Sequence, residues 1–198
     1  MVKLFGGAAA DYWETLRSVL IPLVGKQIAR INSHSDTGYY VSYPTGRDEY
    51  ALQVQKDEES FEEDLEAMGF ERNPVAAFKT LAGTSYKEEG SWYMVHSNND
   101  LHGLDLPSDA IPYVRDGQND FQLHLILYEV DGDENTTVVF AHHELWWGAY
   151  PLSHYRGRYY DPEFGQALLV EIMKDYYDDF DDVVSFKPID DIIDGNKQ

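Results

Sequence analysis

Hydrophobic and polar residues alternate most regularly between residues 121 and 147. Two alternating runs, FQLHLILYEV and TTVVFAHHELWW, flank the turn-forming residues DGDEN, which predicts a β-hairpin whose loop spans residues 131–135. With this loop Val130 lies opposite Thr136, and the pairing continues as far as Phe121 opposite Leu145. This register assigns every residue of the two strands to one face of the sheet.

The two faces of the predicted hairpin differ in polarity, because successive side chains of a strand point to opposite sides. One face is almost entirely apolar and is expected to face the core; its cross-strand pairs are Leu127 with Val139, Leu125 with Ala141, Leu123 with His143 and Phe121 with Leu145. The other face pairs His124 with His142 and Gln122 with Glu144. Opposed residues have Cβ atoms about 4.5–5.5 Å apart, so these polar side chains should form one patch. A slip of one residue would move His142 to the other face.

Apolar residues recur at helical spacing in four further segments, which predicts helices there. The expected helices span residues 9–24, 58–68, 74–82 and 162 to about 177, and each is bounded by capping, proline or glycine residues. The clearest helix start is Asp161-Pro162-Glu163, which offers an N-cap, a proline at the first helical position and an acid at the positive helix end.

Shorter strand-like runs complete the prediction. Three of them, residues 26–32, 38–43 and 49–55, are separated by turn residues and predict an antiparallel meander, and a further strand is expected at 91–96 before an irregular stretch at 97–120. The order of elements predicts an α+β fold with a mainly antiparallel sheet in two three-strand groups and about four helices. The length suits a single domain over residues 1–198, within which residues 1–56 form a candidate subdomain of a helix plus a meander.

The chain carries 36 acidic against 15 basic residues, which gives a formal net charge of -21. This charge opposes binding to nucleic acids or to an anionic membrane surface. Because 43% of the residues are hydrophobic, a packed core is expected in spite of the charge. An acidic surface with so few basic residues fits a salt-rich cytoplasm, and an acidic protein of an ordinary cytoplasm fits equally well.

Cysteine is absent, which excludes disulfides, thiolate metal sites and cysteine nucleophiles. The first twenty residues lack the uninterrupted apolar run of a secretory signal, and no segment has the length and apolar character of a transmembrane helix. A cytoplasmic protein is therefore expected.

The His124, His142 and Glu144 patch is the leading candidate site. Two imidazoles and a carboxylate can bind zinc or another divalent ion and leave a coordination position for water, with Glu144 as ligand or general base. His154 follows closely enough to be an additional ligand. In the alternative interpretation, which the pattern favours, the same residues line a polar sheet face and hydrogen-bond to Tyr128, Trp146 or the irregular stretch.

A second candidate is the aromatic segment WWGAYPLSHYRGRYYDPEF. Here Arg156 and Arg158 could bind an anion while Trp146 or Tyr155 stacks on a ring. The alternative, again favoured, is that both arginines pair with local acids and fix the segment.

The chemistry in the sequence thus leaves two functions open. A non-enzymatic binding or protein-interaction domain is favoured, with an unidentified protein or a second copy of the chain as partner, since aromatic side chains are enriched at interfaces. The alternative is a metal-dependent hydrolase built on the His/His/Glu patch, with a divalent metal as its cofactor. The two differ in whether the three side chains converge.

Overall fold

The computed structural model describes residues 45–73, 90–97, 101, 120–130, 133–155, 157 and 159–195. Several expected elements lie outside these residues: the helix at 9–24, the strands at 26–32 and 38–43, the helix at 74–82 and most of the irregular stretch at 97–120.

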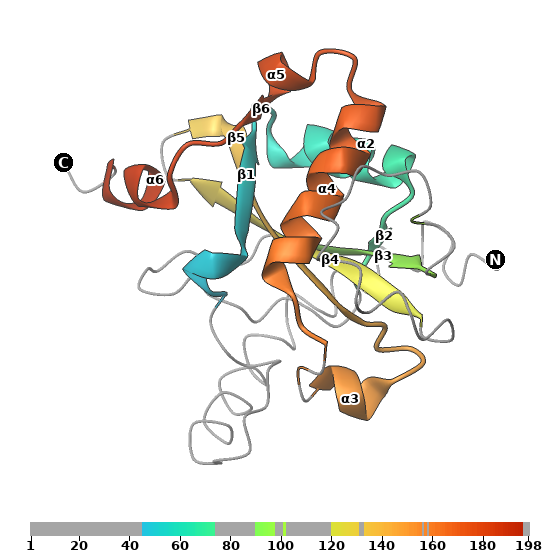
Figure 1. Ribbon diagram of the computed structural model, residues 1–198. Coiled ribbons are helices and arrows are strands. Elements are labelled where there is room, and N and C mark those ends of the chain that lie inside the picture. The colour runs from blue at the N-terminus through green and yellow to red at the C-terminus, as the bar shows by residue number, and fades with distance from the viewer. Residues whose placement is uncertain are drawn as a thin grey trace, which may run out of the picture.

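The described part of the chain contains a six-stranded antiparallel sheet, shown in Figure 1. The strand order is β2-β3-β4-β5-β1-β6. The strands are β1 (Tyr50–Val54), β2 (Glu71–Arg72), β3 (Gly90–His96), β4 (Phe121–Val130), β5 (Asp133–Leu145) and β6 (Val184–Ser185). Together with the helices described below, this sheet confirms the expected α+β class.

The register of the β4–β5 hairpin is as predicted over most of its length. Every pair from Phe121 with Leu145 to Glu129 with Thr137 occurs. The prediction is wrong at the tip, where the register shifts so that Val130 pairs with Asp133. The expected five-residue loop is therefore too long, because β5 begins at Asp133 and an irregularity in the ladder between Glu129 and Val130 lets polar residues continue the strand.

The expected grouping of strands into two sets of three is not confirmed. β1 pairs antiparallel with β5 on one side and with β6 on the other. This arrangement places the start of β1 next to the middle of the hairpin, which becomes important for the site.

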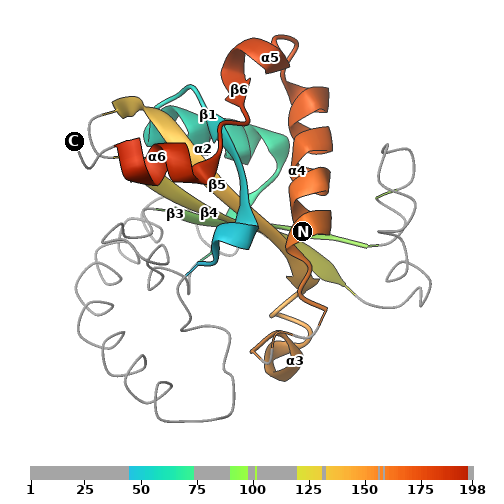
Figure 2. The same cartoon turned by 60° about the vertical axis from the view of Figure 1, so that its left-hand side comes forward.

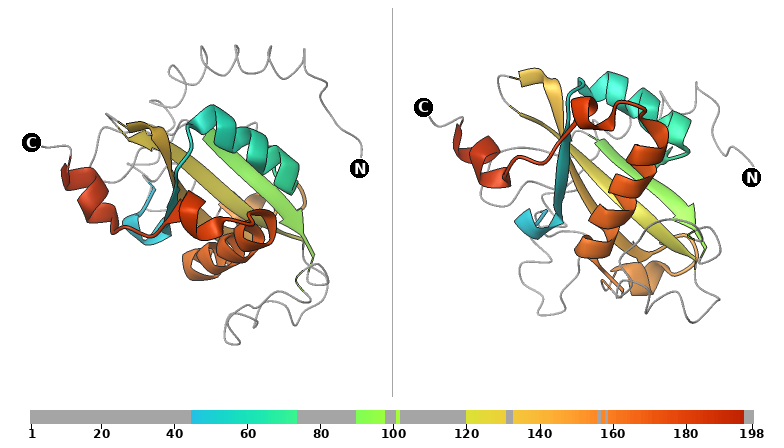
Figure 3. Two further views of the ribbon diagram at one scale, coloured as in Figure 1. Left: turned by 90° about the horizontal axis from the view of Figure 1, so that it is seen from above. Right: turned by 45° about the horizontal axis from the view of Figure 1, so that its top comes forward.

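Two helices cover the apolar face of the hairpin: α2 (Glu58–Met68) and α4 (Pro162–Tyr176). Their ends are those that the sequence predicts. The Asp57 side chain accepts a hydrogen bond from the backbone N–H of Ser60, Gly69 closes α2 in the left-handed conformation at φ 96°, and Asp161 caps α4. Figure 3 shows α4 crossing the strands of the sheet.

The core under these helices contains the apolar face of the hairpin, as expected. Its buried members include Phe61 and Leu65 of α2, Phe164, Leu168, Leu169 and Met173 of α4, and Leu123, Leu125, Leu127, Val139 and Ala141 of the hairpin. A second, smaller cluster joins Ile126, Tyr128, Val138 and Phe140 to Ile192 of α6 (Ile189–Gly195). Figure 2 shows α6 beside this end of the sheet.

Several short elements were not predicted from the sequence: α3 (Pro151–Tyr155), α5 (Phe180–Val183), α6, the 3-10 turn η2 (Arg47–Glu49), β2 and β6. Segments of two to seven residues hold too few repeats for a hydrophobic period to be recognised. Among the described residues, no helix is long and apolar enough to span a membrane.

Candidate metal centre

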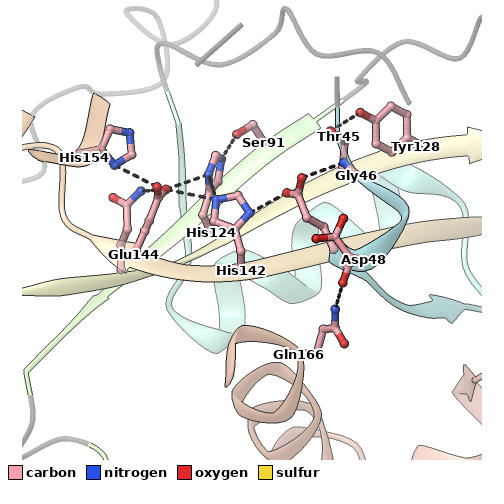
Figure 4. Close-up of polar contacts among 12 residues, drawn as sticks. Thr45, Gly46, Asp48, Ser91, His124, Tyr128, His142, Glu144, His154 and Gln166 are labelled. Atoms are coloured by element: carbon pink, nitrogen blue, oxygen red, sulfur yellow. Dashed lines mark hydrogen bonds and ion pairs between the residues drawn. The ribbon is translucent and has the colours of Figure 1, made fainter. Parts of the chain in front are cut away.

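The hairpin register brings together the polar patch that the sequence predicts. His124 and His142 are cross-strand partners, as are Gln122 and Glu144. Figure 4 shows the side chains of His124, His142 and Glu144 gathered together, with Ser91 of β3 next to His124 and the turn that contains Gly46 beyond His142. His142 and Glu144 are completely buried, and His124 is 4% exposed.

Three candidate ligand atoms form a nearly equilateral triangle. His124 Nδ1 lies 3.0 Å from His142 Nε2, and each of these nitrogens lies 3.2 Å from Glu144 Oε1. Zinc bonds of about 2.0–2.2 Å in tetrahedral geometry place neighbouring ligand atoms roughly 3.3–3.6 Å apart. The triangle is therefore slightly smaller than one face of a zinc coordination tetrahedron, and a small outward shift of the three side chains would match it.

The outer nitrogen of each histidine ring is also occupied. His142 Nδ1 lies 2.9 Å from Glu49 Oε2, and His124 Nε2 lies 2.7 Å from Ser91 Oγ. An ionised carboxylate only accepts, and Glu49 at 2.9 Å is nearer to Nδ1 than Glu144 at 3.2 Å is to Nε2. This difference favours the proton of neutral His142 on Nδ1, with the Nε2 lone pair facing the triangle. Ser91 Oγ can accept from His124 Nε2–H in the same way. Metal-binding histidines commonly donate their outer N–H to such a partner.

The charges in this patch are strongly coupled. Burial alone would raise the pKa of Glu144, but positive charge on His142 and hydrogen bonds from His124 and His142 hold it well below its ordinary value. Burial alone would lower the pKa of His142, but the Glu144 and Glu49 carboxylates raise it above its ordinary value. Glu144 is thus ionised, and a cation is favoured beside it, either a proton on His142 or a metal ion.

Two buried oxygens in the patch accept no hydrogen bond from the part of the chain that the structure describes. They are Glu144 Oε2 and Gln122 Oε1. Gln122 uses its amide N–H to donate to Glu144 Oε1 at 2.8 Å. Buried acceptors are nearly always paired with protein or water, so these two oxygens mark the place where a further donor, such as a bound water, would be favoured.

His154, the expected additional ligand, lies beside Glu144 and not within the triangle. Its Nδ1 is 3.2 Å from Glu144 Oε2 and 3.0 Å from the Leu145 carbonyl, to which it donates. Its side chain is 14% exposed. His154, which belongs to α3, therefore links this helix to the buried Glu144 carboxylate.

The other expected site is not tested. The side chains of Tyr155, Arg156 and Arg158 lie outside the described residues. The Trp146 indole is partly buried, and its Nε1 has no hydrogen-bond partner within the described ranges.

Sequence reasoning missed Glu49 and Ser91. Glu49 is separated from His142 by 93 positions and is placed there only because β1 lies next to β5. No spacing in the sequence indicates that neighbour relation. Ser91 stands at the start of an expected strand, but its pairing partner could not be known.

Comparison with known proteins gives no match: no family model fits the chain, and no curated protein or solved structure is significantly similar to it. Function is therefore inferred from the residues and geometry of the site.

Proposed function

We propose that this protein binds one divalent ion of the zinc class through His124, His142 and Glu144, and that it is a metal-dependent hydrolase. The observation that carries this proposal is the triangle of Nδ1, Nε2 and Oε1 with edges of 3.0–3.2 Å. One ligand atom from each of the three buried side chains lies close enough to the other two to bind the same ion, as metal ligands must.

The donor set supports a borderline ion over a hard one. Two imidazole nitrogens and one carboxylate oxygen suit zinc, and also iron or manganese, whereas calcium and magnesium prefer oxygen ligands. Three protein ligands leave the fourth position for water, which is the arrangement of catalytic zinc sites.

A bound zinc ion would lower the pKa of a coordinated water to about 7. The chain supplies hydrogen-bond acceptors at this position, because Glu144 Oε2 and Gln122 Oε1 accept no hydrogen bond from the described residues; of the two, only the carboxylate could also take up a proton. Glu144 would hold the ion through Oε1 and accept a hydrogen bond from the water through Oε2. His154 Nδ1, 3.2 Å from Oε2, would help to keep this carboxylate ionised.

The interaction function that the sequence favours would use residues 97–120 and the aromatic segment. Most of the former and the key side chains of the latter lie outside the described residues. The site geometry supports the metal centre more directly.

The test is elemental analysis of the full-length, untagged protein, before and after loading with zinc, iron or manganese and removal of excess metal. His142→Ala is compared with His143→Leu, which removes the neighbouring histidine on the opposite face of β5. We expect about one ion per chain in the wild type and in His143→Leu, and none in His142→Ala. A loaded wild-type protein should then hydrolyse a phosphoester or amide substrate in a panel, and a metal-dependent reaction should vanish on chelation.

Wild-type protein that retains no metal under any loading condition would contradict the metal site. Stoichiometric metal without hydrolysis across the panel would contradict the hydrolase and leave a metal-binding protein.

A further inference from the structure

We infer that Glu49 is a positioning residue of the metal centre, which selects the metal-binding tautomer of His142 and fixes its ring. This inference rests on the proposed metal site. Glu49 is contributed by the segment before β1, and no motif or spacing in the sequence connects it to the hairpin.

The contact is specific in geometry. Glu49 Oε2 lies 2.9 Å from Nδ1 of His142, while Nε2 of the same ring lies 3.2 Å from Glu144 Oε1. The two carboxylates thus bind opposite edges of one imidazole. Glu49 can therefore not be a ligand of an ion at Nε2, and its effect on that ion must pass through the ring.

Glu49 is itself held in place. Its side chain is 5% exposed, and its Oε1 accepts a hydrogen bond of 2.8 Å from the backbone N–H of Gly46. The η2 turn that carries it is closed by a bond from Glu49 N–H to the Gly46 carbonyl and is tied to α4 by Gln166, which donates to the Asp48 carbonyl at 2.6 Å. A carboxylate held through Oε1 and carried by a fixed turn presents Oε2 to His142 in one position, which favours a single orientation of that ring.

The consequence is a ligand prepared for metal. His142 donates its Nδ1–H to Glu49, so once the metal-free ring loses its Nε2 proton, the Nε2 lone pair faces the triangle without rotation of the ring. A carboxylate partner also makes the imidazole a stronger donor to the metal, and loss of such partners typically lowers metal affinity about 10–100-fold.

The test is a competition titration of the metal-free, full-length protein with zinc against a chromophoric chelator. Cobalt(II) loading gives a second readout, since its visible spectrum reports the ligand geometry. Glu49→Ala removes the acceptor, and Glu49→Gln keeps the shape but removes the charge. Glu171→Gln is the matched control, since it removes one negative charge from an exposed pair with Lys174 on α4.

We expect zinc affinity to fall about 10–100-fold in Glu49→Ala, by a smaller factor in Glu49→Gln, and not at all in Glu171→Gln. The cobalt spectrum should change in both Glu49 variants. Should Glu49→Ala fail to fold, the isosteric Glu49→Gln decides alone. Wild-type affinity and an unchanged spectrum in Glu49→Gln would overturn the role of Glu49, whereas a wild-type protein without metal would overturn the centre itself.

Discussion

His142 and His143 are neighbours in one strand, both buried, yet their surroundings are opposite. His142 lies between the carboxylates of Glu49 and Glu144, which raise its pKa. His143 packs against the rings of Phe121 and Phe164 at centroid distances of 4.8 and 4.7 Å, and its pKa is held well below the ordinary value by burial and by His96. Because successive side chains of a strand point to opposite faces, His142 lies in a charged polar cluster whereas the adjacent His143 lies in the apolar core.

The contrast extends to hydrogen bonding. Both ring nitrogens of His143 lack a hydrogen-bond partner within the described part of the chain, whereas both nitrogens of His142 face side-chain acceptors. Burying an imidazole without partners costs stability, so His143 should be replaceable and His142 should not.

The largest expected effect on stability comes from a substitution on the apolar face of the hairpin, which leaves the polar face unchanged. Leu125→Ala removes a completely buried side chain and should lower the free energy of unfolding by about 3 kcal/mol. Denaturant unfolding measures this loss, while zinc affinity of the folded fraction should stay at the wild-type value. A parallel loss of affinity would show that the two faces are not independent.

Glu144→Leu, on the polar face, should lower the free energy of unfolding by a similar amount. In metal-free protein it removes the buried partner of His124 and His142, and breaking a buried pair costs about 3 kcal/mol. The same substitution should abolish zinc binding in a competition titration. Retained binding would exclude Glu144 as a ligand.

The stability difference between His143→Leu and the wild type should depend on pH. Because the folded-state pKa of His143 is depressed, its neutral form stabilises the fold above the unfolded pKa of 6.5, and this stability is lost as pH falls. The variant should therefore gain stability over the wild type below pH 6.5, by up to about 1.4 kcal/mol per pH unit. Urea unfolding of both proteins with chelator at several pH values measures the difference, and a constant difference would contradict it.

The contribution of His142 to stability should change with pH in the opposite direction to that of His143. Its folded-state pKa is raised, so its contribution to the metal-free protein is complete below 6.5 and is lost as pH rises, while the depressed pKa of Glu144 contributes above 4.5. The stability of metal-free His143→Leu should therefore be greatest between pH 4.5 and 6.5. A maximum above pH 7 in the same unfolding series would contradict a proton held at His142.

The smallest expected effect is at the cap of α4. Asp161→Ala removes the acceptor for the Phe164 N–H and should cost about 1 kcal/mol, whereas Asp161→Asn should cost less. The backbone bridge between Asp161 and His143 remains in both variants, so zinc affinity should not change. A change in affinity would mean that the cap also supports the centre.

The local parts of this structure could be predicted from the sequence. Alternation gave the hairpin register that pairs His124 with His142, and capping residues gave the ends of α2 and α4. Such features depend on neighbours within a few residues. The tip of the hairpin failed because turn chemistry at Asp133 was outweighed by continuation of the ladder.

The long-range parts could not be predicted. Glu49 reaches His142 because β1 inserts between β5 and β6, and Ser91 reaches His124 because β3 flanks β4. Strand order is decided by the packing of the whole sheet, which no local pattern encodes. The sequence therefore predicted the three side chains of the candidate centre and missed Glu49 and Ser91, which contact the outer nitrogens of its histidines.

The most direct test of the metal centre is anomalous diffraction from crystals of the full-length protein loaded with zinc, recorded on both sides of the zinc absorption edge. We predict one strong anomalous peak about 2.0–2.2 Å from His124 Nδ1, His142 Nε2 and Glu144 Oε1. Zinc bound elsewhere, or a triangle without an anomalous peak in a loaded crystal, would contradict the account.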